Sequence, residues 1–347
     1  MIARIIECIA LSLSLIGVAG SAQTPDSPRT KPIHHYVFFG GDREQIRTMR
    51  AFLDNPQFEG AQIIYPWRSL EPGKDEYDFS AIRDDLAFLK SKNKKLWIQL
   101  QDVTFDSLHI NVPKYLLKDS SYHGGAAKQY SIPAGDESRA VVAGWVARRW
   151  DPAVQARFQK LLLALGKEFD GEIEGINLPE TSLDFGESGR LFPAGFSVAG
   201  YPDAIIANFR ALKIAFPKSI ALQYANFMPG EWRPTDNKGY LERVYHAARN
   251  LGVGVGGPDL LPSRPGQAKG AYPLIRDAAM SVPAGIAVQD GNLEAVNPVT
   301  HKKVTAQELL DFAMNDLRVD YIFWGTQQPY FSNDVVPTVT HGLLHSQ

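Results

Sequence analysis

Eight short apolar segments, most of them followed by a stretch with helical periodicity, constrain the fold of this chain more than any other feature. They span residues 33–40, 60–66, 95–101, 173–178, 219–226, 252–256, 285–289 and 320–324. Repeated alternation of strand and helix indicates a parallel sheet, because the helices provide the connections between parallel strands. Eight such units predict an α/β fold of one domain, a closed (β/α)8 or TIM barrel.

An open, doubly wound sheet is the competing fold. It would require a glycine-rich phosphate turn after the first strand. Gly40 and Gly41 are followed by Asp42, and the later glycine of a dinucleotide fingerprint is absent. The sequence therefore favours the barrel.

The first 22 residues have the pattern of a signal peptide. A short basic start through Arg4 precedes an apolar run from Ile5 to Val18, and small residues follow at Gly20-Ser21-Ala22. The alternative is a membrane anchor, for which the apolar run is short. We expect cleavage, a secreted or periplasmic protein without stable membrane insertion, a flexible lead-in over residues 23–32 and the barrel over residues 33–347.

Composition excludes several classes of function. The only cysteine, Cys8, lies in the signal segment, so a cleaved chain has no thiol for a disulfide, a metal or catalysis. The eight histidines form no metal-binding pattern, no G-x-S-x-G elbow is present, and a net charge of -2 gives no support for nucleic-acid binding. No metal and no cofactor is expected, and the sequence leaves the oligomeric state open.

Two long connections interrupt the pattern, at about residues 102–149 and 184–200. Loops of this length in a compact domain are usually functional, so we expect them to shape the substrate site. Helix starts are also predicted: Asp151 before Pro152 is a typical N-cap, and Thr305 with Glu308 forms a capping box.

The segment at residues 173–178 is followed by Pro179 and Glu180. Residues just past the C-terminal ends of barrel strands surround the substrate site, so Glu180 is the candidate catalytic acid. A loop carboxylate that caps the next turn is the alternative. Other strand ends carry amides, aromatic rings and carboxylates, which suit a hydroxyl-rich carbohydrate. The candidate substrate-binding residues are Trp67, Asn177, Tyr224, Asn226, Asp259, Gln289 and Trp324.

Glycoside cleavage requires a second carboxyl group, which attacks the sugar carbon or activates water. Asp290, after the seventh segment, is the candidate partner of Glu180, and Glu294 is a further one. Purely structural roles remain open as alternatives: Asp290 forming a turn before Gly291, Asp259 forming a turn, and Trp67 in the core. Glu71 is expected to be a structural carboxylate beside Arg68.

Several short motifs resemble clan A (β/α)8 glycoside hydrolases, the relatives of cellulases, xylanases and β-galactosidases. They are residues 67–73 with Tyr77-Asp78-Phe79, Trp150-Asp151-Pro152, the end of the fourth strand with Asn177, and Trp324. The resemblance implies an acid/base Glu after strand four, matched by Glu180, and a nucleophilic Glu after strand seven. The chain departs from that pattern twice: Leu178-Pro179 separate Asn177 from Glu180, and Gln289 stands in the nucleophile's register.

These observations predict a secreted glycoside hydrolase that cleaves O-glycosidic bonds of an oligo- or polysaccharide. A carbohydrate-binding barrel that has lost its nucleophile is the alternative, and a lyase or other hydrolase chemistry at the same mouth is a third possibility. The sugar, the linkage, endo or exo action and the stereochemistry stay open.

Overall fold

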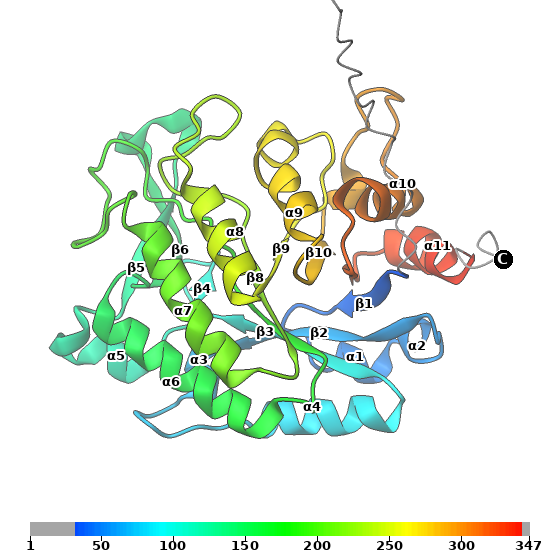
Figure 1. The fold of residues 1–347 in the computed structure, drawn as a ribbon, viewed down its shortest axis with the longest axis horizontal. Helices are drawn as coiled ribbons and strands as arrows, with labels where there is room; N and C mark the ends of the chain where they lie inside the picture. Colours follow the sequence, from blue (N-terminus) through cyan, green and yellow to red (C-terminus); the bar gives the residue numbers. More distant parts are fainter. Residues whose placement is uncertain (1–31, 342–347) are drawn as a thin grey trace, which may run out of the picture.

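The computed structural model describes residues 32–341. The predicted signal peptide and residues 23–31 of the predicted lead-in lie outside this range. Eight parallel strands form a closed barrel in the order β1-β11-β10-β9-β8-β7-β3-β2, with helices around it (Figure 1). The prediction of a single-domain (β/α)8 barrel is confirmed.

The barrel strands follow the predicted segments closely. They are β1 (His34–Phe38), β2 (Phe58–Pro66), β3 (Lys95–Gln101), β7 (Gly175–Leu178), β8 (Ile220–Tyr224), β9 (Gly254–Gly257), β10 (Ala284–Val288) and β11 (Tyr321–Gly325). The helices are α1 (Gln45–Thr48), α2 (Arg50–Leu53), α3 (Trp67–Leu70), α4 (Ser80–Ser91), α5 (Lys114–Lys118), α6 (Pro152–Phe169), α7 (Tyr201–Ala215), α8 (Tyr240–Leu251), α9 (Tyr272–Ala278), α10 (Ala306–Asp311) and α11 (Val336–His341).

Large aromatic side chains fill the interior of the barrel. Tyr36, Trp97 and Phe323 point inward and pack together with neighbours from β8, β10 and β11. Glycines on adjacent strands make room for them: a Cβ at Gly60 would lie 2.6 Å from Tyr36 Cε1, and one at Gly175 would lie 2.8 Å from Trp97 Cη2. The interior is thus a packed core rather than a pore, as is usual in this fold.

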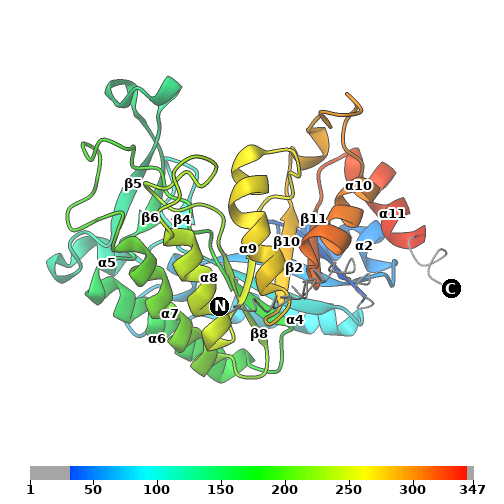
Figure 2. The ribbon, with the colours of Figure 1, turned by 45° about the horizontal axis from the view of Figure 1, so that its top comes forward.

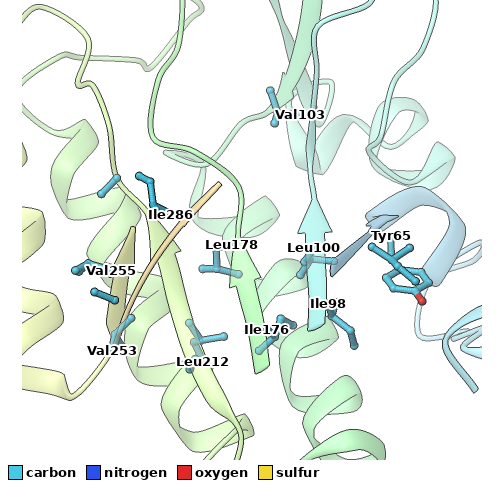
Figure 3. Close-up of a cluster of buried hydrophobic side chains, with 14 of the residues drawn as sticks. Tyr65, Ile98, Leu100, Val103, Ile176, Leu178, Leu212, Val253, Val255 and Ile286 are labelled. Carbon is cyan, nitrogen blue, oxygen red and sulfur yellow. The ribbon is translucent and has the colours of Figure 1, made fainter. Parts of the chain in front are cut away.

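Aliphatic side chains cover the outside of the strands. Ile98 and Leu100 on β3, like Ile176 and Leu178 on β7, are two residues apart and therefore share a face. They are buried in the layer between the barrel and its helices (Figure 3). Since apolar burial contributes about 25 cal/mol per Å², this layer stabilises the packing of the helices on the barrel.

The predicted insertion at residues 102–149 is ordered. It contains α5 and an antiparallel sheet with the order β4-β6-β5, formed by β4 (Val103–Thr104), β5 (Ala126–Ser131) and β6 (Val141–Ala147). The hairpin of β5 and β6 rises beside the barrel (Figure 2). Its Tyr130 N–H donates to the carbonyl of Asp184 at 3.0 Å, so the two predicted long connections support each other.

Both predicted helix starts are confirmed. The Asp151 side chain accepts from the Ala153 and Val154 N–H groups at the start of α6. Thr305 and Glu308 form the capping box of α10. None of the helices within residues 32–341 combines the length and apolar character needed to span a membrane.

Candidate active site

Glu180 lies two residues past β7, the fourth barrel strand, at the C-terminal edge of the barrel. Three contacts fix the backbone there. The carbonyl of Glu180 accepts from Arg149 Nη1 at 2.9 Å. The Thr181 N–H donates to the carbonyl of Tyr224 at 3.1 Å, and the Thr181 hydroxyl donates to the carbonyl of Phe227 at 2.7 Å. The segment carrying Glu180 is therefore clamped to the end of β8.

Asn226 holds the carboxyl group of Glu180. Its Nδ2 donates to Glu180 Oε2 at 2.5 Å. Its Oδ1 accepts from the backbone N–H groups of Ser182 at 3.3 Å and Phe227 at 2.9 Å. Because backbone N–H groups only donate, the oxygen end of the amide must face them, and the nitrogen end must face Glu180. The orientation of Asn226 is thus set by the backbone.

Burial is the main cause that raises the pKa of the Glu180 carboxyl to about 7, and the negative charge of Asp259 raises it further. The hydrogen bond from Asn226 and the positive charges of Arg149 and Arg264 act in the opposite direction. A carboxyl group with a pKa near neutrality is partly protonated at physiological pH and can donate a proton to a leaving group.

Asp259, after β9, is held in the same manner by Asn292. Asn292 Nδ2 donates to Asp259 Oδ1 at 3.2 Å. Asn292 Oδ1 accepts from the N–H groups of Leu260 at 2.9 Å and Gln289 at 3.1 Å. Two carboxyl groups at the barrel mouth are therefore each oriented by an asparagine whose amide is fixed by two backbone donors.

A buried ion pair lies behind Glu180. Arg149 donates from Nε to Asp102 Oδ2 at 2.8 Å and from Nη2 to Asp102 Oδ1 at 2.5 Å. Its Nη1 also donates to the Tyr201 hydroxyl at 2.9 Å. Neither Asp102 nor Arg149 is among the site residues predicted from the sequence, although Asp102 follows the third predicted strand. The motif Trp150-Asp151-Pro152 directly after Arg149 was the one available pointer to it.

Comparison with known proteins identifies the fold. No protein-family model matches the sequence, and no curated protein matches it. The structure is similar to the catalytic domain of a β-amylase from Paenibacillus polymyxa, with a TM-score of 0.55 and 10% sequence identity over 84% of this chain and 92% of that one.

Two further structures are similar over most of this chain. GH5_18 from Streptomyces cattleya in complex with GlcNAc has a TM-score of 0.51 and 12% identity, over 85% of this chain and 70% of that one. A thermostable mutant of a xylanase from Cellvibrio japonicus has a TM-score of 0.50 and 13% identity, over 87% of this chain and 91% of that one. At these identities the likeness is one of fold. It confirms the (β/α)8 barrel fold.

Two predicted sugar-binding residues lie below the mouth. Asn177 and Tyr224 are fully buried in the barrel interior. Gln62 Nε2 donates to Asn177 Oδ1 at 3.0 Å and to the Tyr224 hydroxyl at 2.8 Å, and Trp97 Nε1 donates to the same Asn177 oxygen at 3.0 Å. Both side chains therefore brace the barrel under the site instead of lining its surface.

The expectation that Trp67 and Trp324 provide faces for a sugar is not met. Both are completely buried, whereas a sugar platform must expose a ring face. Trp67 Nε1 donates to Glu71 at 2.8 Å, and its ring packs against Phe158. Trp324 points outward from β11 and donates to His35 Nδ1 at 3.1 Å. The structural role expected for Glu71 fits this geometry, but its ion-pair partner is Arg157 and not Arg68.

The remaining candidate residues, Gln289, Asp290 and Glu294, follow the end of β10. Gln289 is half-buried, and Asp290 is exposed. Glu294 accepts from Gln327 Nε2 at 3.0 Å, and Gln327 Oε1 accepts from the Gly291 N–H at 2.8 Å. The pairing of Glu180 with Asp290 stays a prediction, but the carboxylate with an electrostatic effect on Glu180 is Asp259. Within residues 32–341, no three His, Cys, Asp or Glu side chains are grouped to hold a metal ion.

Proposed function

We propose that this protein is a glycoside hydrolase that cleaves O-glycosidic bonds of an oligo- or polysaccharide. Glu180 is the general acid and Asp259 is the second carboxylate. One observation carries the proposal: Glu180 lies at the mouth of the barrel, and burial together with the negative charge of Asp259 raises its pKa to about 7. Such a pair, with one member kept protonated by its environment, suits glycoside cleavage.

Each carboxyl group has a defined task in the proposed reaction. Glu180 protonates the glycosidic oxygen as the bond to the sugar carbon breaks. Asp259 Oδ1 is held by Asn292, and Oδ2 is the oxygen that acts on the sugar carbon or removes a proton from the attacking water. Retention or inversion at the anomeric carbon, followed by NMR during hydrolysis, reports which of these two tasks Asp259 performs.

The central experiment measures hydrolysis of a polysaccharide panel by the wild type and by Glu180→Gln. We expect the substitution to lower kcat by about 10²- to 10⁴-fold, the usual contribution of a positioned acid. Glu172→Gln is the control, because Glu172 is exposed and its carboxylate pairs with the exposed Lys90. Undiminished cleavage by Glu180→Gln overturns the assignment.

A second pair of variants distinguishes the two possible partners of Glu180. If Asp259 is the second carboxylate, Asp259→Asn abolishes turnover and Asp290→Asn retains most of it. The reverse result returns the role to Asp290, as the sequence predicted.

A non-catalytic carbohydrate-binding barrel is the second candidate function. Gln289 favours this function. It occupies the position at which the clan A glycoside hydrolases, which the sequence resembles, have their nucleophilic Glu, and an amide cannot act as that nucleophile. This function predicts saccharide binding by calorimetry with no turnover of any member of the panel. Export to the periplasm or medium belongs to both proposals, and N-terminal sequencing of the mature protein tests it.

A further inference from the structure

A stacked aromatic pair lies directly beside the Glu180 site. Phe227 follows Asn226 in the chain, and its ring stacks on Trp232 with a centroid distance of 5.9 Å and an interplanar angle of 14°. Phe227 is half-buried, whereas Trp232 is 47% exposed. An indole that is held in place and still accessible is suited to pack against a sugar ring.

The loop that carries Trp232 is preformed. The buried carboxylate of Glu231 accepts from the N–H groups of Lys238 at 2.9 Å, Tyr240 at 3.1 Å and Leu241 at 2.9 Å. The backbone at Gly266 packs closely under the rings, since a Cβ there would lie 2.4 Å from Trp232 Cη2. Little conformational entropy would be lost when a ligand binds this surface.

Arg264 connects the aromatic pair to the candidate catalytic carboxylates. Its Cζ lies 5.7 Å from the centroid of the Phe227 ring, and its Nη1 lies 3.8 Å from Asp259 Oδ2. That separation is too long for a hydrogen bond. The guanidinium is half-exposed and donates no hydrogen bond to any residue of the described range 32–341.

Two buried arginine pairs within residues 32–341 show what a purely structural pairing looks like. Arg149 forms two hydrogen bonds to Asp102, and Arg157 donates directly to Glu71. Arg264, by contrast, stacks on Phe227 and leaves its planar set of N–H donors open. A planar guanidinium of this kind matches a carboxylate with two parallel hydrogen bonds.

We infer that Trp232, Phe227 and Arg264 form a subsite for an acidic sugar, in which Trp232 packs against a pyranose ring and Arg264 binds the carboxylate of a uronic acid. The inference rests on the proposed function and names its substrate class: polysaccharides that contain uronic acid residues. The substrate carboxylate accepts from the guanidinium N–H groups, none of which donates a hydrogen bond to Asp259.

The test measures binding to the Glu180→Gln protein, which prevents turnover during calorimetry. The ligands are uronic-acid oligosaccharides, the same oligosaccharides after chemical reduction of their carboxyl groups, and sulfated neutral oligosaccharides of equal length. We expect the carboxylated ligands to bind at least about tenfold more tightly than the reduced ones, the value of one charge-assisted hydrogen bond.

Substitutions then assign that preference to its residues. Arg264→Gln removes the preference for carboxylated ligands, whereas Trp232→Ala weakens binding of carboxylated and reduced ligands alike. Arg249→Gln, on the exposed side of α8, is the matched control and changes neither. Thermal unfolding of each variant confirms that the fold is intact.

Three results overturn the inference: equal affinity for carboxylated and reduced ligands, an unchanged ratio in Arg264→Gln, or a preference for sulfated over carboxylated ligands. If one of these results is found while the wild type cleaves neutral glycans and Glu180→Gln does not, the proposed function holds and only this inference fails. If no glycan is bound or cleaved, the proposed function fails with it.

Discussion

Asn226 donates a hydrogen bond to Glu180 and cannot turn its amide around, because its oxygen already accepts from the Ser182 and Phe227 N–H groups. A donor aimed at a carboxyl group favours the ionised form. This bond therefore keeps the pKa of Glu180 near 7 instead of higher, at a value where the group exchanges protons readily. The relationship makes Asn226 a positioning residue with a measurable electrostatic effect.

Asn226→Ala is expected to raise the pKa of Glu180 above about 7, because the bond that stabilises the carboxylate is lost. Asn226→Asp is expected to raise it as well, since two adjacent carboxyl groups share one proton. Carboxyl chemical shifts of labelled glutamate, followed by NMR against pH, give the value directly. Asn315→Ala, at an exposed site, is the control. A pKa that falls in Asn226→Ala would contradict the assignment.

Glu180→Gln is expected to stabilise the fold at neutral pH. In the unfolded chain the carboxyl ionises near its ordinary value of 4.5, whereas in the folded protein it stays protonated up to about 7. The folded state therefore binds the extra proton between these values, and stability falls as pH rises through that window. The full loss is at most about 3 kcal/mol.

Denaturant unfolding at several pH values measures this effect. The stability difference between Glu180→Gln and the wild type should be small below pH 4.5, grow up to about pH 7 and stay constant above it. A difference that does not depend on pH would mean that Glu180 titrates normally in the folded protein.

Asn292→Ala is expected to lower kcat/KM by about 10²-fold, because Asp259 loses the donor that orients it and small displacements of a reacting group are costly. Steady-state kinetics on the best substrate of the panel provides the measurement. Asn315→Ala again serves as the control. Full activity in Asn292→Ala would show that Asp259 does not need this support.

Trp67→Phe is expected to destabilise the protein by about 1–3 kcal/mol, because the buried carboxylate of Glu71 loses the indole donor. It should leave saccharide affinity unchanged, since Trp67 is completely buried. Trp232→Ala should show the opposite pattern, weaker binding at nearly unchanged stability. Denaturant unfolding measures the stability of both variants, and calorimetry measures their saccharide affinity. Weaker saccharide binding by Trp67→Phe would show that Trp67 contributes to the binding site.

Gly60→Ala is expected to be strongly destabilising, because its Cβ would lie 2.2 Å from the carbonyl oxygen of Lys95 and 2.6 Å from the Tyr36 ring. Overpacking of this kind costs about 1–3 kcal/mol or more. Gly41→Ala is the matched control, with no atom within 4 Å of the added carbon. The unfolding temperatures of the two variants should differ by several degrees. Equal unfolding temperatures would mean that the barrel interior relaxes around the new methyl group.

The barrel and the position of Glu180 could be predicted because both depend on local pattern. Short apolar runs and helical stretches alternate along the chain, and parallel strands require such crossover connections. A residue just past the C-terminal end of a barrel strand lies at the mouth, whether the last side chains of that strand point inward or outward. For the same reason Asn226 and Asp259 were found as candidates, although their actual contacts are with Glu180, Asn292 and Arg264.

Only the tertiary structure decided which side chains reach the site. Barrel strands are buried on both faces, so Asn177, Tyr224 and Trp324 have no polar alternation that would distinguish inward from outward or surface from core. The choice between Asp259 and Asp290 likewise depends on contacts between loops far apart in the sequence. The alternation of elements thus determined the architecture, whereas packing between strands determined the chemistry that the mouth can support.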